Sequence, residues 1–219
     1  MLIIVLASDT EPVYCRFQDA WKLASHPRAD ILFLKAHPDI QGGDFISNDT
    51  IFIRCRESHS TVHEKQLRGF RALLPRLANY AYVLRTNLSS FIDIEKYLAF
   101  CETLPRTGVY SGVIGYHPRT RFASGSGFTI TPDLIHRLVR ENPPEIEVDD
   151  VSIGGAITSW GVPIIPAPRF DYASSDPSLP DPDIPSNVFH HRIKTSNRQH
   201  DAELLTRLFR RNSNAAIQQ

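Results

Sequence analysis

The chain begins with a continuous apolar run, and similar runs recur along its first half. Residues 1–7 read MLIIVLA and are followed by Ser8, Asp9 and Thr10, a pattern that predicts a buried strand ending in a polar loop. Three more apolar runs predict buried strands, at residues 30–36, 49–54 and 80–85. Apolar residues on both faces of a strand are typical of a sheet that is covered on both sides.

Helical periodicity separates these strands. Residues 12–24 and 63–78 each place apolar side chains three or four positions apart, on one helical face. Asp93 predicts the N-cap of a third helix that reaches about residue 102. Alternating strands and helices predict an α/β fold, with a mixed, mostly parallel central sheet flanked by helices in a single domain.

The second half of the chain has a different pattern. It predicts glycine-interrupted strands, further helices and two more strands, at residues 108–115, 122–131, 132–142, 147–160, 161–168, 187–194 and 200–211. Residues 163–188 hold seven prolines and little periodicity. Long irregular loops are often functional, so this stretch is a candidate lid over a ligand. A passive surface excursion is an equally good interpretation.

Composition and charge narrow the class of protein. The 219 residues carry 24 basic and 24 acidic side chains, and this balance argues against binding nucleic acid through bulk charge. The first apolar run is too short for a membrane span or a signal peptide, so we expect a cytoplasmic protein without an integral membrane segment. Cys15, Cys55 and Cys101 form no CxxC pair, and an odd count favours reduced thiols.

Polar residues follow the predicted strands at their carboxyl ends. In α/β sheets, ligands bind outside the carboxyl ends of the strands. The loops at residues 8–10, 54–60 and 86–90 are therefore expected to surround one crevice.

Two short motifs stand near this edge. Residues 85–91 read RTNLSSF directly after a buried strand, which suits a phosphorylated ligand or, equally, a turn that caps the next helix. Residues 123–128 read ASGSGF. Gly125 and Gly127 allow a close backbone approach, and a strand bend or bulge is the alternative.

Two further motifs carry titratable side chains. Asp149 and Asp150 open a predicted helix, where they either complement the helix dipole or supply a general base. His190 and His191 are adjacent in a predicted strand. Successive strand side chains alternate faces, so only one of the two can face a given site, and a basic surface strand is the alternative.

The order of these motifs resembles the beta-1,3-galactosyltransferase and Fringe-like group of glycosyltransferases, which have the GT-A fold. Small viral and bacterial glycosyltransferases are similar to the same degree. The group reads Thr-Asp-Asp-Asp-x-Phe, then Gly-x-Gly-Tyr, then Glu-Asp-Val-x-x-Gly. This chain has TNLSSF at 86–91, GSGF at 125–128 and DDVSIG at 149–154, and the resemblance covers roughly residues 1–160.

The resemblance implies a role for each motif. It implies one GT-A-like domain, with a nucleotide-sugar-binding half at residues 1–105 and an acceptor half at residues 106–219. The activity implied is inverting transfer from a UDP-sugar to an acceptor hydroxyl, with Asp150 as the base and Asp149 beside it. The donor would contact Ser8, Asp9, Lys65, Arg85, Asn87 and Ser89. The acceptor, or the pocket wall, would involve Gly125, Ser126 and Gly127.

One departure from the group concerns the metal. The acidic triplet that binds a divalent cation is replaced here by residues 87–89, which read NLS, and hard cations prefer carboxylates. This favours weak or absent dependence on Mn²⁺ or Mg²⁺, with His190 or His191 as a remaining ligand. Otherwise Lys65, Arg85, Arg192 or Lys194 would neutralise the diphosphate.

The lost triplet also keeps other functions open. A non-catalytic module that binds a sugar or a nucleotide sugar is the alternative to the enzyme. A nucleotidyltransferase is less favoured, because its acidic metal ligands have no counterpart in the motifs. Fold analogy alone does not decide among these functions.

Overall fold

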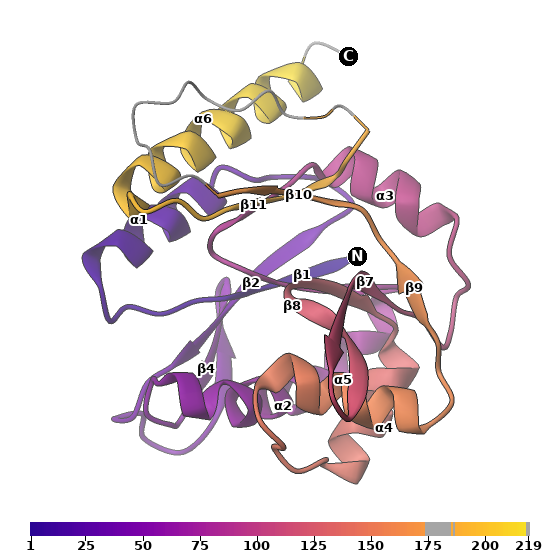
Figure 1. Cartoon of the computed structure of the whole chain (residues 1–219). Helices are drawn as coiled ribbons and strands as arrows, with labels where there is room; N and C mark the ends of the chain where they lie inside the picture. The colour runs from indigo at the N-terminus through magenta and orange to yellow at the C-terminus, as the bar shows by residue number, and fades with distance from the viewer. Residues whose placement is uncertain (174–184, 186, 218–219) are drawn as a thin grey trace.

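The central sheet has eight strands in the order β3-β4-β2-β1-β5-β8-β7-β9 (Figure 1). The computed structural model describes residues 1–173, 185 and 187–217. The strands are β1 (Leu2–Leu6), β2 (Asp30–Ala36), β3 (Phe45–Ser47), β4 (Thr50–Ile53), β5 (Val83–Asn87), β7 (Tyr110–His117), β8 (Thr120–Ile130) and β9 (Ile164–Pro166). β4, β2, β1 and β5 are mutually parallel, whereas β8 is antiparallel to both β5 and β7. The predicted mixed α/β sheet is therefore confirmed.

A second, three-stranded sheet lies against one side of this core. Its order is β10 (Arg169–Tyr172), β11 (His190–Ile193) and β6 (Ser90–Ile92). β6 follows β5 after two residues, yet its partner β11 comes from near the end of the chain, and the two pair antiparallel. The second sheet therefore brings C-terminal residues to the carboxyl end of β5.

Helices cover both faces of the central sheet (Figure 1). One side holds α1 (Pro12–Trp21), α3 (Ile94–Glu102) and α6 (Arg198–Ile217), and the other holds α2 (Val62–Leu73), α4 (Pro132–Glu141) and α5 (Asp149–Ser159). β1 explains the continuous apolar runs, because Ile3 and Val5 enter one core while Leu2 and Ile4 enter the other. Among the described residues, the helices are all too short or too polar to cross a membrane.

Most predicted elements are present, with shifted ends. The helix predicted to reach residue 78 ends at Leu73 and continues as a 3₁₀ segment, Leu74–Asn79, because Pro75 cannot donate the next helical hydrogen bond. Asp93 caps α3 as predicted and accepts a hydrogen bond from the Lys96 amide at 3.2 Å. A further 3₁₀ turn spans His59–Thr61.

Three short strands were not predicted. β3, β6 and β10 have three or four residues each, too few to show an alternating pattern. β9 and β10 give regular structure to part of the proline-rich stretch. Of the candidate lid at residues 163–188, residues 174–184 and 186 lie outside the described residues, so this interpretation stays untested.

Strand order fixes where a ligand would bind. The chain goes from β1 to β2 on one side and later to β5 on the other. The direction of winding thus reverses between β1 and β5, and a crevice opens outside the carboxyl ends of two such strands.

Candidate functional site

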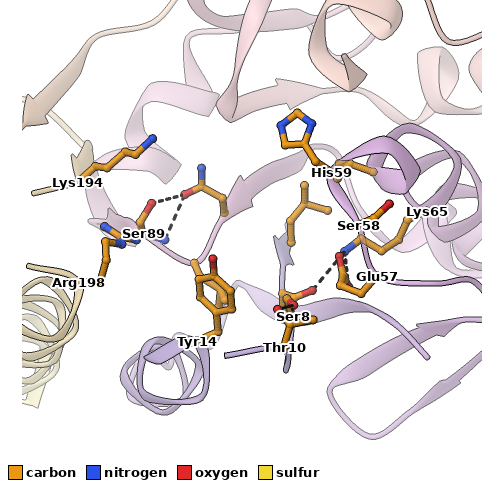
Figure 2. Close-up of a pocket in the computed structure, with 15 residues that line it drawn as sticks. Ser8, Thr10, Tyr14, Glu57, Ser58, His59, Lys65, Ser89, Lys194 and Arg198 are labelled. Carbon is orange, nitrogen blue, oxygen red and sulfur yellow. Dashed lines mark hydrogen bonds and ion pairs between the residues drawn. The ribbon is translucent and has the colours of Figure 1, made fainter. Parts of the chain in front are cut away.

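A cavity of about 500 Å³ lies at this reversal point, within the range usual for small-molecule sites. It is lined by Leu6, Ala7, Ser8, Thr10, Tyr14, Glu57, Ser58, His59, Val62, Lys65, Asn87, Leu88, Ser89, Lys194 and Arg198. Figure 2 shows these side chains converging from several elements. The predicted meeting of the three loops at residues 8–10, 54–60 and 86–90 is confirmed, because all three contribute to this lining.

Asn87, at the end of β5, forms a tight polar turn. Its Oδ1 accepts hydrogen bonds from the Ser89 amide at 3.2 Å and from Ser89 Oγ at 3.1 Å, and Ser90 Oγ lies 3.1 Å away. The side-chain oxygen is therefore fully used within the turn. What Asn87 has left for a ligand is its NH₂ group, which is a donor.

Lys65 lies on α2 with its ammonium group buried beneath the cavity. Its Nζ donates to Glu57 Oε1 at 2.7 Å, to Glu57 Oε2 at 2.9 Å and to the Ala7 carbonyl at 3.3 Å. These three contacts use all the hydrogens of the ammonium group. Glu57 also accepts from the Ala36 amide, so the pair ties the ends of β1 and β2 to the loop after β4.

Ser8 and Asp9 follow β1. Ser8 lines the cavity, and its Oγ lies 2.9 Å from Thr10 Oγ1. Asp9 accepts hydrogen bonds from Gln18 Nε2 at 2.8 Å and from Lys35 Nζ at 2.9 Å. Burial acts to raise the pKa of Asp9, but these hydrogen bonds outweigh it and lower the pKa. Asp9 is thus held as a carboxylate beside the cavity.

Two cations from the end of the chain form the opposite wall. Lys194 follows β11, and Arg198 begins α6 (Figure 2). Arg198 donates to the Ile193 carbonyl and pairs with the buried Asp201. Lys194 is exposed, and its ammonium group has no partner among the residues that the structure describes. It is therefore the cavity cation that can take a ligand's negative charge at least cost.

Asp149 and Asp150, at the start of α5, do not line the cavity. β8 is paired antiparallel to β5 with Thr86 opposite Gly127, so Gly125 lies just beyond the end of β5. The Gly125 amide donates to Asp150 Oδ2 at 2.7 Å. Burial raises the pKa of Asp150, and the neighbouring Asp149 raises it further, the direction that suits a general base.

Arg85 and Asp149 form a buried ion pair next to Asp150. Arg85 Nη2 donates to Asp149 Oδ2, and Arg85 Nε donates to Gln66 Oε1 at 3.1 Å. Arg85 is 2% exposed and does not line the cavity. The structure thus places this predicted donor-binding residue with the carboxylates.

Ser126 and Gly127 join the two sheets. The Ser126 carbonyl accepts from Thr86 Oγ1 at 2.8 Å, and its hydroxyl accepts from Arg169 Nη1 on β10. At Gly127 a Cβ would lie 2.9 Å from His190 Nδ1, so only glycine fits against this ring. Both residues therefore hold the second sheet against the end of β5.

Neither of the predicted histidine ligands lines the cavity. His190 is 4% exposed, and its Nε2 lies 3.1 Å from Ser90 Oγ. Burial and the nearby Arg169 lower the pKa of His190 to about 3. His191 Nε2 lies 2.9 Å from the Val188 carbonyl, and burial also lowers its pKa.

The side chains around the cavity do not fit a divalent metal. Within the described ranges no three His, Cys, Asp or Glu side chains cluster closely enough to hold an ion. Glu57, the carboxylate in the described lining, is already neutralised by Lys65, and the oxygen of Asn87 is used in its own turn. The described part of the site instead offers hydrogen-bond donors and one exposed ammonium group.

No protein-family model and no curated sequence matches the chain. Solved structures do match it. One is the galactosyltransferase LgtC in complex with donor and acceptor sugar analogues, at 14% identity and a TM-score of 0.52, covering 98% of this chain and 96% of that one. Another is a glycosyltransferase involved in glycosylation of the major capsid of PBCV-1, at 10% identity and a TM-score of 0.53, covering 94% and 98%.

These likenesses establish the fold. The chain has the GT-A-like fold of these glycosyltransferases over nearly its whole length, as the motif order implied. The link to the Fringe-like group stays a prediction, as do the roles of individual residues.

Sequence reasoning missed several cavity residues. Tyr14 and Arg198 reach the cavity because α1 packs against α6, a contact with no local signature. Glu57 and His59 belong to a loop whose position was predicted without naming them. The sequence signal for this loop is the carboxyl end of the buried strand before it. That signal locates the loop but does not show which of its side chains enter the cavity.

Proposed function

We propose that this chain is an inverting glycosyltransferase that moves a sugar from a nucleotide sugar to an acceptor hydroxyl, with Asp150 as the general base. The observation that carries the proposal is the Asp150 carboxylate, held on the amide of Gly125 in β8, the strand that pairs with β5. The last residue of β5, Asn87, lines the cavity. The GT-A-like fold supports the reaction class. The motif resemblance supports a UDP-sugar as donor.

The proposed reaction is one displacement. Asp150 accepts the proton of the acceptor hydroxyl, whose oxygen forms a bond to the anomeric carbon as the bond to the diphosphate breaks. The electron pair leaves with the nucleoside diphosphate, and the anomeric configuration inverts. A positioned general base contributes about 10²–10⁴-fold to such a step.

The described lining supports one orientation of the donor. Lys194 and the NH₂ group of Asn87 border the same cavity and suit the diphosphate, whose charge must be offset as it leaves. Ser8 and the neighbouring Asp9, at the end of β1, suit the nucleoside. The partners proposed are thus a nucleotide sugar and a carbohydrate-containing acceptor, met in the cytoplasm.

We also propose that donor binding depends weakly or not at all on Mn²⁺ or Mg²⁺. Support comes from the chemistry of the side chains, because the cavity offers donors where a hard cation needs free carboxylates. The charge of the diphosphate is met by Lys194 instead.

The proposal is tested first at Asp150. We expect Asp150→Asn to lower the transfer rate 10²–10⁴-fold and to leave nucleotide affinity within about twofold, because Asp150 does not line the cavity. Asp133→Asn is the matched control, since Asp133 also lies in the first turn of a helix and accepts a hydrogen bond from a glycine amide, that of Gly108. NMR of the product gives its anomeric configuration. Wild-type transfer by Asp150→Asn, or a retained configuration, would contradict the mechanism.

The proposal on metal is tested by calorimetry. UDP, GDP and CMP are titrated with Mn²⁺ and then with EDTA, and we expect the affinity of the preferred nucleotide to survive EDTA. Lys194→Ala should weaken that affinity about tenfold, the effect expected for one charge-assisted phosphate contact. Lys22→Ala, which removes an exposed lysine paired with Asp19 on α1, should change nothing. Loss of binding in EDTA would show that a metal is required.

The second candidate function is a non-catalytic module that binds a sugar or a nucleotide sugar. The observation that favours it is the replaced acidic triplet at residues 87–89. This function predicts nucleotide affinity that depends on Lys194, together with no turnover of any donor by the wild-type protein. Donor turnover that is lost in Asp150→Asn would exclude it.

A further inference from the structure

Arg85 is enclosed on three sides by protein. On α2, Gln66 Oε1 accepts a hydrogen bond from Arg85 Nε at 3.1 Å. On β8, the Phe128 ring centroid lies 5.6 Å from the guanidinium carbon. On α5, Asp149 Oδ2 accepts a hydrogen bond from Arg85 Nη2. These contacts leave Arg85 2% exposed and away from the cavity lining, so a donor diphosphate bound in the cavity would not reach it.

Arg85 and Asp150 approach the same backbone position. A Cβ at Gly125 would lie 2.9 Å from Arg85 Nη1 and 2.9 Å from Asp150 Oδ2. The Asp150 carboxylate is fixed there through both oxygens, because Oδ2 accepts from the Gly125 amide at 2.7 Å and Oδ1 from the Val151 amide at 3.0 Å. The two acidic side chains that open α5 are thus attached to β5 and β8 separately.

We propose that Arg85 is a positioning residue, which through its ion pair with Asp149 holds the first turn of α5 against the sheet so that Asp150 stays on the Gly125 amide. The proposal rests on Asp150 being the base of the proposed reaction. It assigns Arg85 a role that differs from the donor contact implied by the sequence resemblance. Asp149 has a role as well, because it accepts the hydrogen bond that the buried guanidinium group donates to α5.

The pair also controls the charge around Asp150. Among the described residues, the charged or titratable groups that face Asp150 are Asp149 on α5, Arg85 on β5 and Tyr110 on β7. β8 contributes the neutral Gly125 amide, and α2 reaches only Arg85, through Gln66. Asp149 acts to raise the pKa of Asp150 and Arg85 acts to lower it. Removing Asp149 should therefore lower the pKa of Asp150, and removing Arg85 should raise it.

The test compares Arg85→Gln, Asp149→Asn and the double variant. The acid limb of the kcat/KM profile marks the titration of Asp150, which must be ionised to act as a base. We expect this limb to move up by about one pH unit in Arg85→Gln and down by about one unit in Asp149→Asn, as for a charge a few ångströms away. In the double variant the acid limb should return near its wild-type pH, because the opposite effects of the two lost charges on Asp150 cancel. Its kcat should stay below that of the wild type, because the ion pair that holds α5 against the sheet is lost.

A second readout does not need activity. The ¹³C chemical shift of the Asp150 carboxyl is followed against pH in the full chain, and the same opposite shifts are expected. If the protein transfers no sugar but these shifts occur, the positioning pair stands and the proposed function fails. If transfer is normal and the shifts are absent or in one direction, the positioning proposal fails alone.

Two more variants serve as controls for this test. Arg85→Lys keeps the charge and should keep the wild-type titration of Asp150, even if Arg85→Gln does not fold. Arg68→Gln removes a partly buried arginine on α2, one paired with Asp44 and Glu64, and should leave the pH profile unchanged. An Arg85→Lys variant with weaker nucleotide affinity and an unchanged pH profile would overturn the proposal and restore Arg85 as a donor contact.

Discussion

Gly125 shows how one missing Cβ can make room for the proposed base, Asp150. Because a Cβ there would lie 2.9 Å from both Arg85 Nη1 and Asp150 Oδ2, Gly125→Ala should push the carboxylate off the amide. We expect transfer to fall about 10²-fold, as for a displacement of about 1 Å at a reacting group. Nucleotide affinity should change little, because Gly125 is outside the cavity lining. Wild-type turnover by Gly125→Ala would mean that the amide contact is not needed.

Strand ends predicted many site residues but not their partners. Ser8, Asn87 and Ser89 line the cavity because the carboxyl ends of neighbouring parallel strands meet at one edge. The direction of Arg85 could not be predicted, because the space between α2 and α5 that receives it depends on tertiary packing. The replaced triplet was visible in the sequence, but the turn that uses up the Asn87 oxygen was not.

At the scale of elements, α5 depends on close contact with β8 at one glycine. A Cβ on Gly154 would overlap the Phe122 side chain and lie 2.7 Å from the Phe122 Cα. Gly154→Ala should therefore force α5 from the sheet and cost about 1–3 kcal/mol of unfolding free energy. A Cβ on the adjacent Gly155 would lie no closer than 3.7 Å to any described neighbour outside its own helix. Gly155→Ala should therefore stabilise the helix by up to about 1 kcal/mol. Urea unfolding of both variants measures the difference, and equal effects would argue against this packing.

Elements were predictable to the extent that their own residues define them. The run at β1 is recognisable because both faces of that strand are buried and its residues are all apolar. The run at β2 is recognisable from its buried centre, Leu32, Phe33 and Leu34. β6 could not be recognised, because it is a three-residue strand whose partner β11 lies far along the chain. Long-range pairing of this kind leaves no local pattern.

At the scale of the whole molecule, His190 couples stability to pH. Its ring is enclosed between β6 and β8, close to Ser90 and Gly127, and burial holds its pKa at about 3 in the folded state. An unfolded histidine has a pKa near 6.5. As the pH falls, His190 is therefore protonated in the unfolded chain before it is protonated in the folded one. The contribution of neutral His190 to folding stability is complete above about pH 6.5 and is lost as the pH falls toward 3.

The expected loss can be measured by urea unfolding. Between pH 7 and pH 5, His190 should account for about 2 kcal/mol of lost stability, at about 1.4 kcal/mol per pH unit below 6.5. His190→Gln, which can keep a hydrogen bond to Ser90, should show a correspondingly flatter dependence on pH. His136→Gln, at an exposed site on α4, should behave like the wild type. A pH dependence of His190→Gln equal to that of the wild type would contradict this account.

The second sheet has a consequence for the order in which the protein matures. Ser90 and His190 are one hundred residues apart in sequence, and the cavity wall at Lys194 and Arg198 follows β11. Chains leave the ribosome N-terminus first, so a nascent chain can assemble β1, β2 and β5 long before that wall exists. A chain stalled before residue 190 should not retain nucleotide. Under the proposed function, nucleotide binding would therefore require that synthesis has passed β11, the last strand in the described part of the chain.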